Sequence, residues 1–348
     1  MSQTDQSKVD ELDLERLSEY LKPHLPASSG ELVAEKFSGG QSNPTFLLSS
    51  GDAKYVLRRQ PPGRLLKSAH AVDREYRVYE ALANTPVPVP KVFHLCEDRD
   101  VIGSMFYVME YCEGRIFWGA ALPELPSNEE RALAYDQMNA NLAHIHSLDL
   151  ESVGLADYGK PGNYFERQLS RWTQQYKASE IDPIPAMDQL IEWLEANIPE
   201  DDGKVALVHG DYRLDNMMFA KDRTEIIAVL DWELSTLGHP YADLAYQCMQ
   251  LRMPTAGKMS GLAGVNRESL GIPSEKDYVA SYCKRMGLES IDHWAFYLAF
   301  SFFRLAAIAQ GVAKRAQDGN ASNKEAKQVG SYVAPLAMAA LNVIKTEA

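Results

Sequence analysis

The spacing of apolar residues divides this chain into a strand-rich stretch, from about residue 31 to 110, and a mainly helical remainder. Residues 8–25 precede that stretch and carry apolar side chains at helical spacing until Pro23, which ends the predicted helix. Within the stretch, Thr45–Leu48 and Lys54–Arg58 flank a short turn and therefore predict a hairpin. The same pattern predicts a helix at 68–83 and strands at 91–97 and 106–111.

After residue 113 the apolar positions follow a helical period almost throughout. The exception is the segment 251–273, which is rich in Gly, Met, Ser and Pro and is interpreted as a mobile loop. The chain is therefore assigned to the α+β class, with a helical extension (1–30), a small β-rich lobe (31–112) and a large helical lobe (113–348). The predicted helices of the large lobe cover 128–148, two segments within 163–198, 240–252, 275–287, 291–316 and 322–345.

The composition excludes several classes of protein. With 348 residues, 45% of them apolar, the chain is long enough to bury a sizeable core. Its 48 acidic and 35 basic side chains give a net charge of −13, which argues against a nucleic-acid partner. The four cysteines are too widely spaced for a disulfide framework or a zinc site, and the apolar run 294–303 is too short to span a bilayer. We therefore expect a soluble, cytoplasmic protein with neither nucleic acid nor membrane as its partner.

Two short segments carry the candidate chemistry. Val208–Asn216 contains Asp211, with Asn216 five positions later, and Asp231 follows a second apolar run, fifteen positions after Asn216. Two turns rich in Asp and Asn would look similar, but the order and spacing of both segments favour catalysis. Phosphoryl transfer from ATP needs a carboxylate that orients the acceptor hydroxyl, together with oxygen ligands for Mg²⁺. Asp211 is therefore the predicted catalytic residue, and Asn216 and Asp231 are the predicted metal ligands.

These motifs also resemble a known family. His209-Gly210-Asp211, with Asn216 and Asp231, is similar to the catalytic and metal-binding loops of aminoglycoside phosphotransferases. The resemblance covers the chain from about residue 30 onward, and it implies a protein-kinase-like fold of two lobes that uses ATP and Mg²⁺. The segments that resemble, more narrowly, the kinase-like domains fused to acyl-CoA dehydrogenases are Tyr55–Gly63, Ser68–Arg77 and Leu230–Gly238.

The segment Phe37–Thr45 lies where the resembling family has a loop that covers the phosphates. Gly39 and Gly40 would let backbone N–H groups approach phosphate oxygens, and Ser42 and Asn43 would donate hydrogen bonds from their side chains. An ordinary turn would also be rich in glycine. Neither GxGxxG nor GxxxxGK[ST] occurs in the chain, which disfavours a Rossmann or P-loop nucleotide site.

Five further residues are nucleotide-site candidates because of the same resemblance. Arg58 stands where kinase-like proteins have a lysine for the α- and β-phosphates, and it keeps the charge while presenting a planar fork. Glu75 is its expected partner, and the alternative is that Glu75 is a solvated helix charge. The segment that would offer backbone groups to adenine consists of Glu110, Tyr111 and Cys112.

Polar residues around the catalytic motif are expected to support it. His209 is predicted to brace the loop, and Asp243 to cap or anchor a helix. Arg213 and Asp215 either pair within the loop or face the acceptor, and the sequence leaves both open. His144 and His146 are expected to be core or capping histidines rather than metal ligands, because residues two positions apart on a helix do not share a face.

The nature of the phosphoryl acceptor is less well determined. Residues 123–202 hold 16 acidic and 5 basic side chains, which suits a cationic acceptor such as an aminoglycoside. Residues 251–348 hold 12 basic and 8 acidic side chains, and Arg304, Lys314 and Arg315 there would suit the phosphates of coenzyme A.

Similarity to domains beside acyl-CoA dehydrogenases favours a hydroxyacyl-CoA or another hydroxylated small molecule as the acceptor, with the loop 251–273 near it. The expected function is therefore that of a small-molecule kinase. The alternatives are an aminoglycoside phosphotransferase and a catalytically silent nucleotide-binding module. The presence of Asp211, Asn216 and Asp231 argues against the silent module, and the oligomeric state is not determined by these residues.

Overall fold

The computed structural model describes residues 12–26, 30–37, 43–61, 70–255, 260–318 and 326–347. The chain divides into two compact units. Unit 1 comprises Met1–Ile116, Glu151–Leu155 and Asn216–Ser235, and unit 2 comprises Phe117–Leu150, Ala156–Asp215 and Thr236–Ala348. The lobe boundary expected near residue 112 stays a prediction.

Unit 1 is built on an antiparallel sheet with the strand order β1-β2-β3-β5-β4. The predicted hairpin is confirmed, because β2 pairs with β3 across a turn at Gly51 and Asp52. In the centre of the sheet, Leu57 lies opposite Phe46 on one side and Val108 on the other. The strands are β1 (Val33–Lys36), β2 (Thr45–Ser50), β3 (Ala53–Arg59), β4 (Val92–Cys96) and β5 (Phe106–Glu110).

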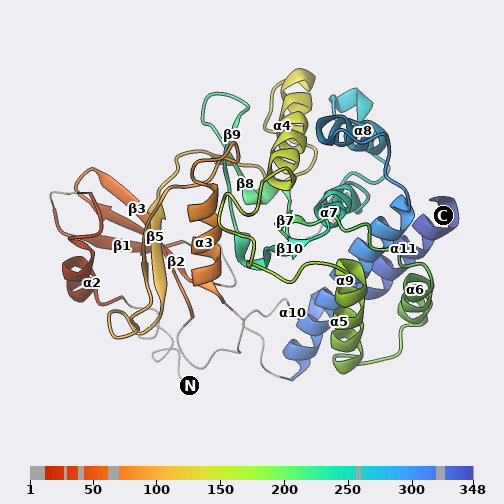
Figure 1. Ribbon diagram of the computed structural model, residues 1–348, viewed down its shortest axis with the longest axis horizontal. Helices are drawn as coiled ribbons and strands as arrows, with labels where there is room; N and C mark the ends of the chain where they lie inside the picture. The colour runs from red at the N-terminus through yellow and green to blue at the C-terminus, as the bar shows by residue number, and fades with distance from the viewer. Residues whose placement is uncertain are drawn as a thin grey trace. The chain divides into compact units, whose positions relative to one another are not determined.

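Each face of this sheet is covered by one helix, and Figure 1 shows α2 and α3 on opposite sides of it. Because side chains alternate along a strand, Leu48, Leu57 and Phe106 share the face that packs against Leu17 and Leu21 of α2 (Leu14–Leu21). The other face, which includes Arg58 and Tyr107, meets α3 (Val72–Leu82). Within the described residues, the expected helical spans are wrong at residues 12–13 and 70–71, which are not helical. Asp13 caps α2 by accepting the N–H of Arg16 at 3.1 Å, and this leaves residues 12 and 13 outside the helix.

A second small sheet completes unit 1, in the order β6-β8-β9. Its strands are β6 (Arg115–Ile116), β8 (Met217–Phe219) and β9 (Ile226–Val229), and the short 3₁₀ helix η2 (Trp232–Leu234) follows. Gly114 allows β6 to approach β8, since a Cβ at that position would lie 2.4 Å from the backbone oxygen of Phe219. This pairing places Asn216–Ser235 with unit 1, although the chain on either side of that segment belongs to unit 2.

Unit 2 is mainly helical, as expected. Its two short strands, β7 (Ala206–Val208) and β10 (Thr236–Gly238), pair in antiparallel fashion. The helix expected at 322–345 is instead two helices in the part that the structure describes, since the 3₁₀ turn η4 (Gly330–Tyr332) lies between them. The helices are α4 (Asn128–His146), α5 (Tyr164–Ala178), α6 (Pro185–Ala196), α7 (Tyr241–Leu251), α8 (Glu275–Met286), α9 (Trp294–Gln317), α10 (Ala326–Val329) and α11 (Val333–Glu347).

Helix α9 lies at the centre of unit 2 and packs against α5, α7 and α11 (Figure 1). Its aromatic residues surround Phe165 of α5, whose ring centroid is 4.9 Å from that of Tyr297 and 5.3 Å from that of Phe300. By length and composition α9 could cross a membrane, but 78% of its most apolar window is buried within the protein. Such burial is typical of a core helix.

Replacing Leu17 by alanine tests whether α2 is part of the core of unit 1. Leu17 is fully buried, so Leu17→Ala leaves a cavity, and we expect it to lower the free energy of unfolding by about 2–5 kcal/mol. Urea denaturation measures this change. Glu19→Ala, at an exposed position of the same helix, is the matched control. Equal stability of the two variants would show that α2 does not contribute to the core.

Candidate active site

Arg58 is the centre of a charged cluster in unit 1. Its Nε lies 3.0 Å from Oε2 of Glu75 on α3, so the predicted ion pair between these residues is present. Its Nη2 lies 2.7 Å from Oδ1 of Asp231 and 3.3 Å from Oε2 of Glu233, both from the segment after β9. A guanidinium on β3 thus joins carboxylates from two other segments of the chain. Its planar fork is suited to several oxygen partners at once.

The hairpin β8–β9 brings the two predicted metal ligands to one end. Met217 lies opposite Val229, so Asn216 and Leu230 are the next residues on their strands, and the N–H of Leu230 donates to the carbonyl of Asn216 at 2.8 Å. Asp231 then adopts a left-handed conformation with φ of 65°, which Asp tolerates better than most residues. Its own N–H is 3.3 Å from the hydroxyl of Tyr79 on α3. The backbone conformation of this segment therefore sets the position of the Asp231 side chain.

The cluster contains more carboxylates than cations. The Glu75 side chain is fully buried, the Arg58 side chain is 14% exposed, and that of Asp231 is 34% exposed. Burial raises the pKa of Glu75 to about 7, since it outweighs the lowering effect of Arg58, and the charges of Asp231 and Glu233 add to it. Although burial opposes its charge, the pKa of Arg58 is raised, chiefly by Glu75, so Arg58 stays cationic.

Of the four site candidates in the predicted phosphate-covering loop, only Asn43 is among the described residues. Gly39, Gly40 and Ser42 lie outside the described residues. Asn43 is buried; its Nδ2 donates to Oε2 of Glu233 at 3.2 Å, and its Oδ1 is 3.0 Å from Nδ1 of His70. This side chain therefore connects the loop to the Arg58 cluster. Its contact with a phosphate stays a prediction.

Oxygen donors at the end of the hairpin fit a hard divalent cation such as Mg²⁺. Within the described ranges, no group of three or more His, Cys, Asp and Glu side chains is arranged to hold a metal. Asn216 and Asp231 would supply two oxygens between them, and Mg²⁺ at nucleotide sites usually takes its remaining ligands from phosphates and water. The donor set therefore fits a metal that arrives with a nucleotide better than a resident one.

The three residues expected to offer backbone groups to adenine, Glu110, Tyr111 and Cys112, lie at the end of β5 and directly after it. Glu110 is the last residue of β5, where its N–H donates to the carbonyl of Lys91 at 2.8 Å. The amine of Lys54 lies 5.5 Å from the centre of the Tyr111 ring, and burial together with Glu110 raises the pKa of the Cys112 thiol to about 11. Their contact with adenine stays a prediction.

In unit 2, the loop after β7 is held through its backbone. Gly210 has a φ of 83°, which glycine adopts without strain. The carboxylate of Asp243 on α7 accepts the N–H of His209 at 2.6 Å and that of Gly210 at 2.9 Å, while Nη2 of Arg304 on α9 donates to the carbonyl of Gly210 at 2.8 Å. Buried side chains therefore hold both the N–H and the carbonyl of Gly210.

Asp243 is itself supported by a buried histidine. Nε2 of His146 lies 3.5 Å from Oδ2 of Asp243, and Nδ1 of the same ring is 2.7 Å from the hydroxyl of Tyr282. Burial alone would raise the pKa of Asp243, but His146, His209 and the N–H of Gly210 hold it below its usual range. His146 is a core residue, as predicted, whereas His144 is exposed. The expectation that Asp243 caps or anchors a helix is corrected, because its side chain caps no helix and instead holds the loop after β7.

Asp211 is half-buried and bonded to α7. The hydroxyl of Tyr246 donates to Oδ1 of Asp211 at 2.8 Å, and the N–H of Asp211 lies 3.2 Å from Nδ1 of His209. His209 therefore braces the loop, as predicted. Of the two arrangements left open for Arg213, the structure shows the pair within the loop, with Nη2 2.6 Å from Oδ2 of Asp215.

The expectation for Arg304 is wrong. Arg304 is not an exposed phosphate ligand, because it is only 9% exposed and its guanidinium donates to the Gly210 carbonyl.

The roles of Glu233 and Tyr246 were not predicted from the sequence. A signal for Tyr246 does exist, since Asp243 and Tyr246 lie three positions apart and share one face of a helix.

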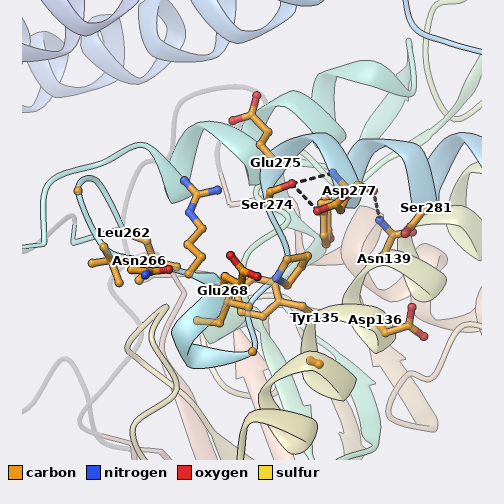
Figure 2. Close-up of a pocket in the computed structure, with 18 residues that line it drawn as sticks. Tyr135, Asp136, Asn139, Leu262, Asn266, Glu268, Ser274, Glu275, Asp277 and Ser281 are labelled. Carbon is orange, nitrogen blue, oxygen red and sulfur yellow. Dashed lines mark hydrogen bonds between the residues drawn. The ribbon is translucent and has the colours of Figure 1, made fainter.

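A hollow of about 900 Å³ in unit 2 lies between α4, α8 and the segment 262–275 (Figure 2). No predicted site residue lines it. Figure 2 shows Asn139 and Asp277 bonded to neighbouring residues, and Glu275 is paired with Arg252 at 2.6 Å. Because these polar groups already have protein partners, the site is better identified with the catalytic motif than with this hollow.

Residues 33–269 match the sequence profile of the phosphotransferase enzyme family. Acyl-CoA dehydrogenase family member 10 from Mus musculus is 47% identical over 323 residues, which are 92% of this chain and 30% of that protein. Acyl-CoA dehydrogenase family member 11 from Rattus norvegicus is 44% identical over 336 residues, which are 95% of this chain and 43% of that protein. The chain thus spans less than half the length of these relatives, and the narrower resemblance read from the sequence is confirmed.

Solved structures confirm the kinase-like α+β fold. A protein from Ralstonia eutropha JMP134, provisionally named an aminoglycoside phosphotransferase, matches with a TM-score of 0.88 and 47% identity, over 96% of this chain and 99% of that chain. A thermostable mutant of aminoglycoside phosphotransferase APH(4)-Ia, in a ternary complex with AMP-PNP and hygromycin B, matches with a TM-score of 0.62. That match covers 94% of this chain and 98% of that chain at 16% identity, so it shows the fold alone.

Glu75→Gln tests the raised pKa of the buried glutamate. Below about pH 4.5, Glu75 is protonated in both the folded and the unfolded chain; as pH rises, the unfolded chain ionises first. We therefore expect the unfolding free energy of the wild type to fall relative to Glu75→Gln, by about 3 kcal/mol in all, as pH rises to about 7. Urea titrations of both proteins across this range measure the difference. A difference that does not vary with pH would contradict the raised pKa.

Proposed function

This chain belongs to the phosphotransferase enzyme family, and we propose that it is a small-molecule kinase that transfers the γ-phosphoryl group of MgATP to a hydroxyl group. One observation carries the proposal. In unit 1, the cation Arg58 is paired with Asp231. Asp231 lies at one end of the hairpin β8–β9, where Asn216 also lies. These are the residue types that a triphosphate and its metal need.

The nucleotide would be bound by groups of unit 1. Asn216 and Asp231 would hold Mg²⁺, which, when bound, neutralises the charge that develops on the transferred phosphoryl group. Arg58 would contact the phosphates, since its guanidinium offers five N–H donors and remains cationic. The related fold that holds AMP-PNP supports ATP as the donor.

Asp211 would orient the acceptor hydroxyl and accept its proton late in the transfer. A carboxylate is too weak a base to remove an alcohol proton beforehand, so its contribution is positioning followed by late proton transfer. The support for this role is the rigid loop, in which Gly210 is held by Asp243 and Arg304 and the Asp211 carboxylate is bonded to Tyr246.

We favour a hydroxyacyl-CoA as the acceptor. The support is the similarity to regions of proteins named acyl-CoA dehydrogenase family members. Two of the cations that would suit coenzyme A phosphates are engaged elsewhere, because Arg304 is buried and Nζ of Lys314 lies 2.6 Å from Asp318. The acidic stretch 123–202 and the name of the Ralstonia protein favour an aminoglycoside as the second candidate.

The proposal is tested by transfer of labelled γ-phosphate from MgATP to a panel of acceptors. The panel contains hydroxyacyl-CoA thioesters, free hydroxy acids, choline-like alcohols and aminoglycosides. We expect labelled product from the thioesters. Transfer to aminoglycosides alone would replace our first acceptor by the second, and tight MgATP binding without transfer to any member would favour the silent module.

Asp211→Asn tests the catalytic role. The amide keeps the shape of the side chain but cannot accept the proton, so we expect kcat to fall by about 10²–10⁴-fold while the Kd for MgATP changes little. Steady-state kinetics and calorimetric titration measure the two quantities. Asp182→Asn, at an exposed position of the same unit, is the control. Turnover that survives Asp211→Asn would contradict the role.

Asp231→Ala tests the metal site. Loss of the carboxylate removes the anionic oxygen ligand, so we expect the variant to lose the gain in ATP affinity that Mg²⁺ provides. Nucleotide titrations with and without Mg²⁺ measure this gain. Asp222→Ala, whose side chain is 79% exposed in the same unit, is the matched control. An unchanged gain in the Asp231 variant would exclude the metal role.

A further inference from the structure

Tyr246 is a buried side chain whose polar end reaches the predicted catalytic carboxylate. It lies on α7 and is 8% exposed, and its hydroxyl donates to Oδ1 of Asp211 at 2.8 Å. The two residues are 35 positions apart in the sequence, so this bond depends on the fold of unit 2 rather than on the loop. A tyrosine that served only to fill the core would not need to direct its hydroxyl at this atom.

The ring of Tyr246 is held in place from its other side. The guanidinium of Arg304 on α9 lies 5.8 Å from the centre of the Tyr246 ring and 5.8 Å from that of Trp172 on α5. The same guanidinium donates to the carbonyl of Gly210, next to Asp211. One buried arginine therefore fixes both the backbone of the loop and the ring that bonds its carboxylate.

The phenol can only donate in this position. Burial and the neighbouring Asp211 carboxylate raise the pKa of Tyr246, so its hydroxyl keeps its proton at physiological pH. The other charged groups that act on this hydroxyl are Arg213 in the loop and Arg304 on α9. Tyr246 is therefore a neutral donor set beside two cations.

We propose that Tyr246 is a positioning residue, whose hydroxyl fixes the orientation of the Asp211 carboxylate toward the acceptor hydroxyl; this rests on the kinase function proposed above. In the transfer, the acceptor oxygen forms a bond to the γ-phosphorus, and the bond from that phosphorus to the bridging oxygen breaks. ADP leaves with the electron pair. The acceptor proton passes to Asp211, and Tyr246 keeps its own proton throughout.

Tyr246→Phe tests the proposal by removing one oxygen and keeping the ring. With the acceptor identified in the panel, we expect kcat to fall about 10-fold or more, because the carboxylate can now rotate away from its productive orientation. The KM for MgATP should change by less than about twofold, since unit 1 is unaltered. Tyr241→Phe, which removes a hydroxyl from another buried tyrosine of α7, is the matched control. Equal kcat values for the two variants would overturn the proposal.

A second measurement does not depend on the acceptor. The ¹³C resonance of the Asp211 carboxylate is assigned as the one that disappears in Asp211→Asn, and its chemical shift is compared between the proteins at one neutral pH. Loss of the hydrogen bond from Tyr246 changes this chemical shift in Tyr246→Phe but not in Tyr241→Phe. An unchanged chemical shift overturns the proposal even if the kinase function holds. A changed chemical shift in a protein that transfers no phosphate shows that the bond is present and the kinase function is wrong.

Discussion

The guanidinium of Arg58 is the interaction on which the organisation of unit 1 depends. It joins β3, α3 and the segment after β9, three parts of the chain that have no covalent reason to meet. Glu75 is fully buried, and a buried carboxylate without a cation nearby would cost several kcal/mol. The strand, the helix and the hairpin must therefore assemble together. The place of Asp231 is a consequence of that assembly, because the same guanidinium holds its Oδ1.

In unit 2, hydrogen bonds from buried side chains hold the loop after β7 in place. Its central feature is a single residue, Gly210, whose N–H is held by Asp243 and whose carbonyl is held by Arg304. Both side chains come from buried helices, so the loop is rigid although it has no regular structure. The backbone of Asp211 is therefore held in place, and the bond from Tyr246 restricts the rotation of its side chain. Precise placement of a reacting group is a large part of what an enzyme contributes to phosphoryl transfer.

The success of sequence reasoning varied with the distance between partners. The hairpin β2–β3 and the long helices follow from local periodicity. The roles of Asp211, Asn216 and Asp231 stay a prediction, which rests on their spacing. The helical span expected at residues 12 and 13 was wrong because Asp13 is a cap, and α2 begins after it at Leu14. The break between α10 and α11 was missed for a comparable reason, since a single 3₁₀ turn does not disturb the helical period. Local signals thus predict that an element exists better than where it ends.

The residues that sequence reasoning missed have partners far away in the chain. Asn43 bonds Glu233 across 190 positions, and no local pattern in one sequence reports which side chains will meet at that separation. Arg304 illustrates the opposite error, in which a cation in a basic stretch was interpreted as a phosphate ligand although burial had assigned it to the Gly210 carbonyl. A count of charged residues gives the net charge of a segment, whereas the role of one charged side chain depends on whether the fold leaves it exposed to water.

The arginine at position 58 is best understood together with Glu233. A lysine has a single nitrogen at the end of its chain, whereas Arg58 uses Nε toward Glu75 and Nη2 toward Asp231 and Glu233 at the same time. With a lysine there, Glu233 would keep the amide of Asn43 but lose a charged donor in a place that is only 20% exposed. Arginine at position 58 and glutamate at position 233 therefore support each other. Arginine at the position where kinase-like proteins have a lysine thus keeps a cation there and ties that cation to the segment that carries Asp231 and Glu233.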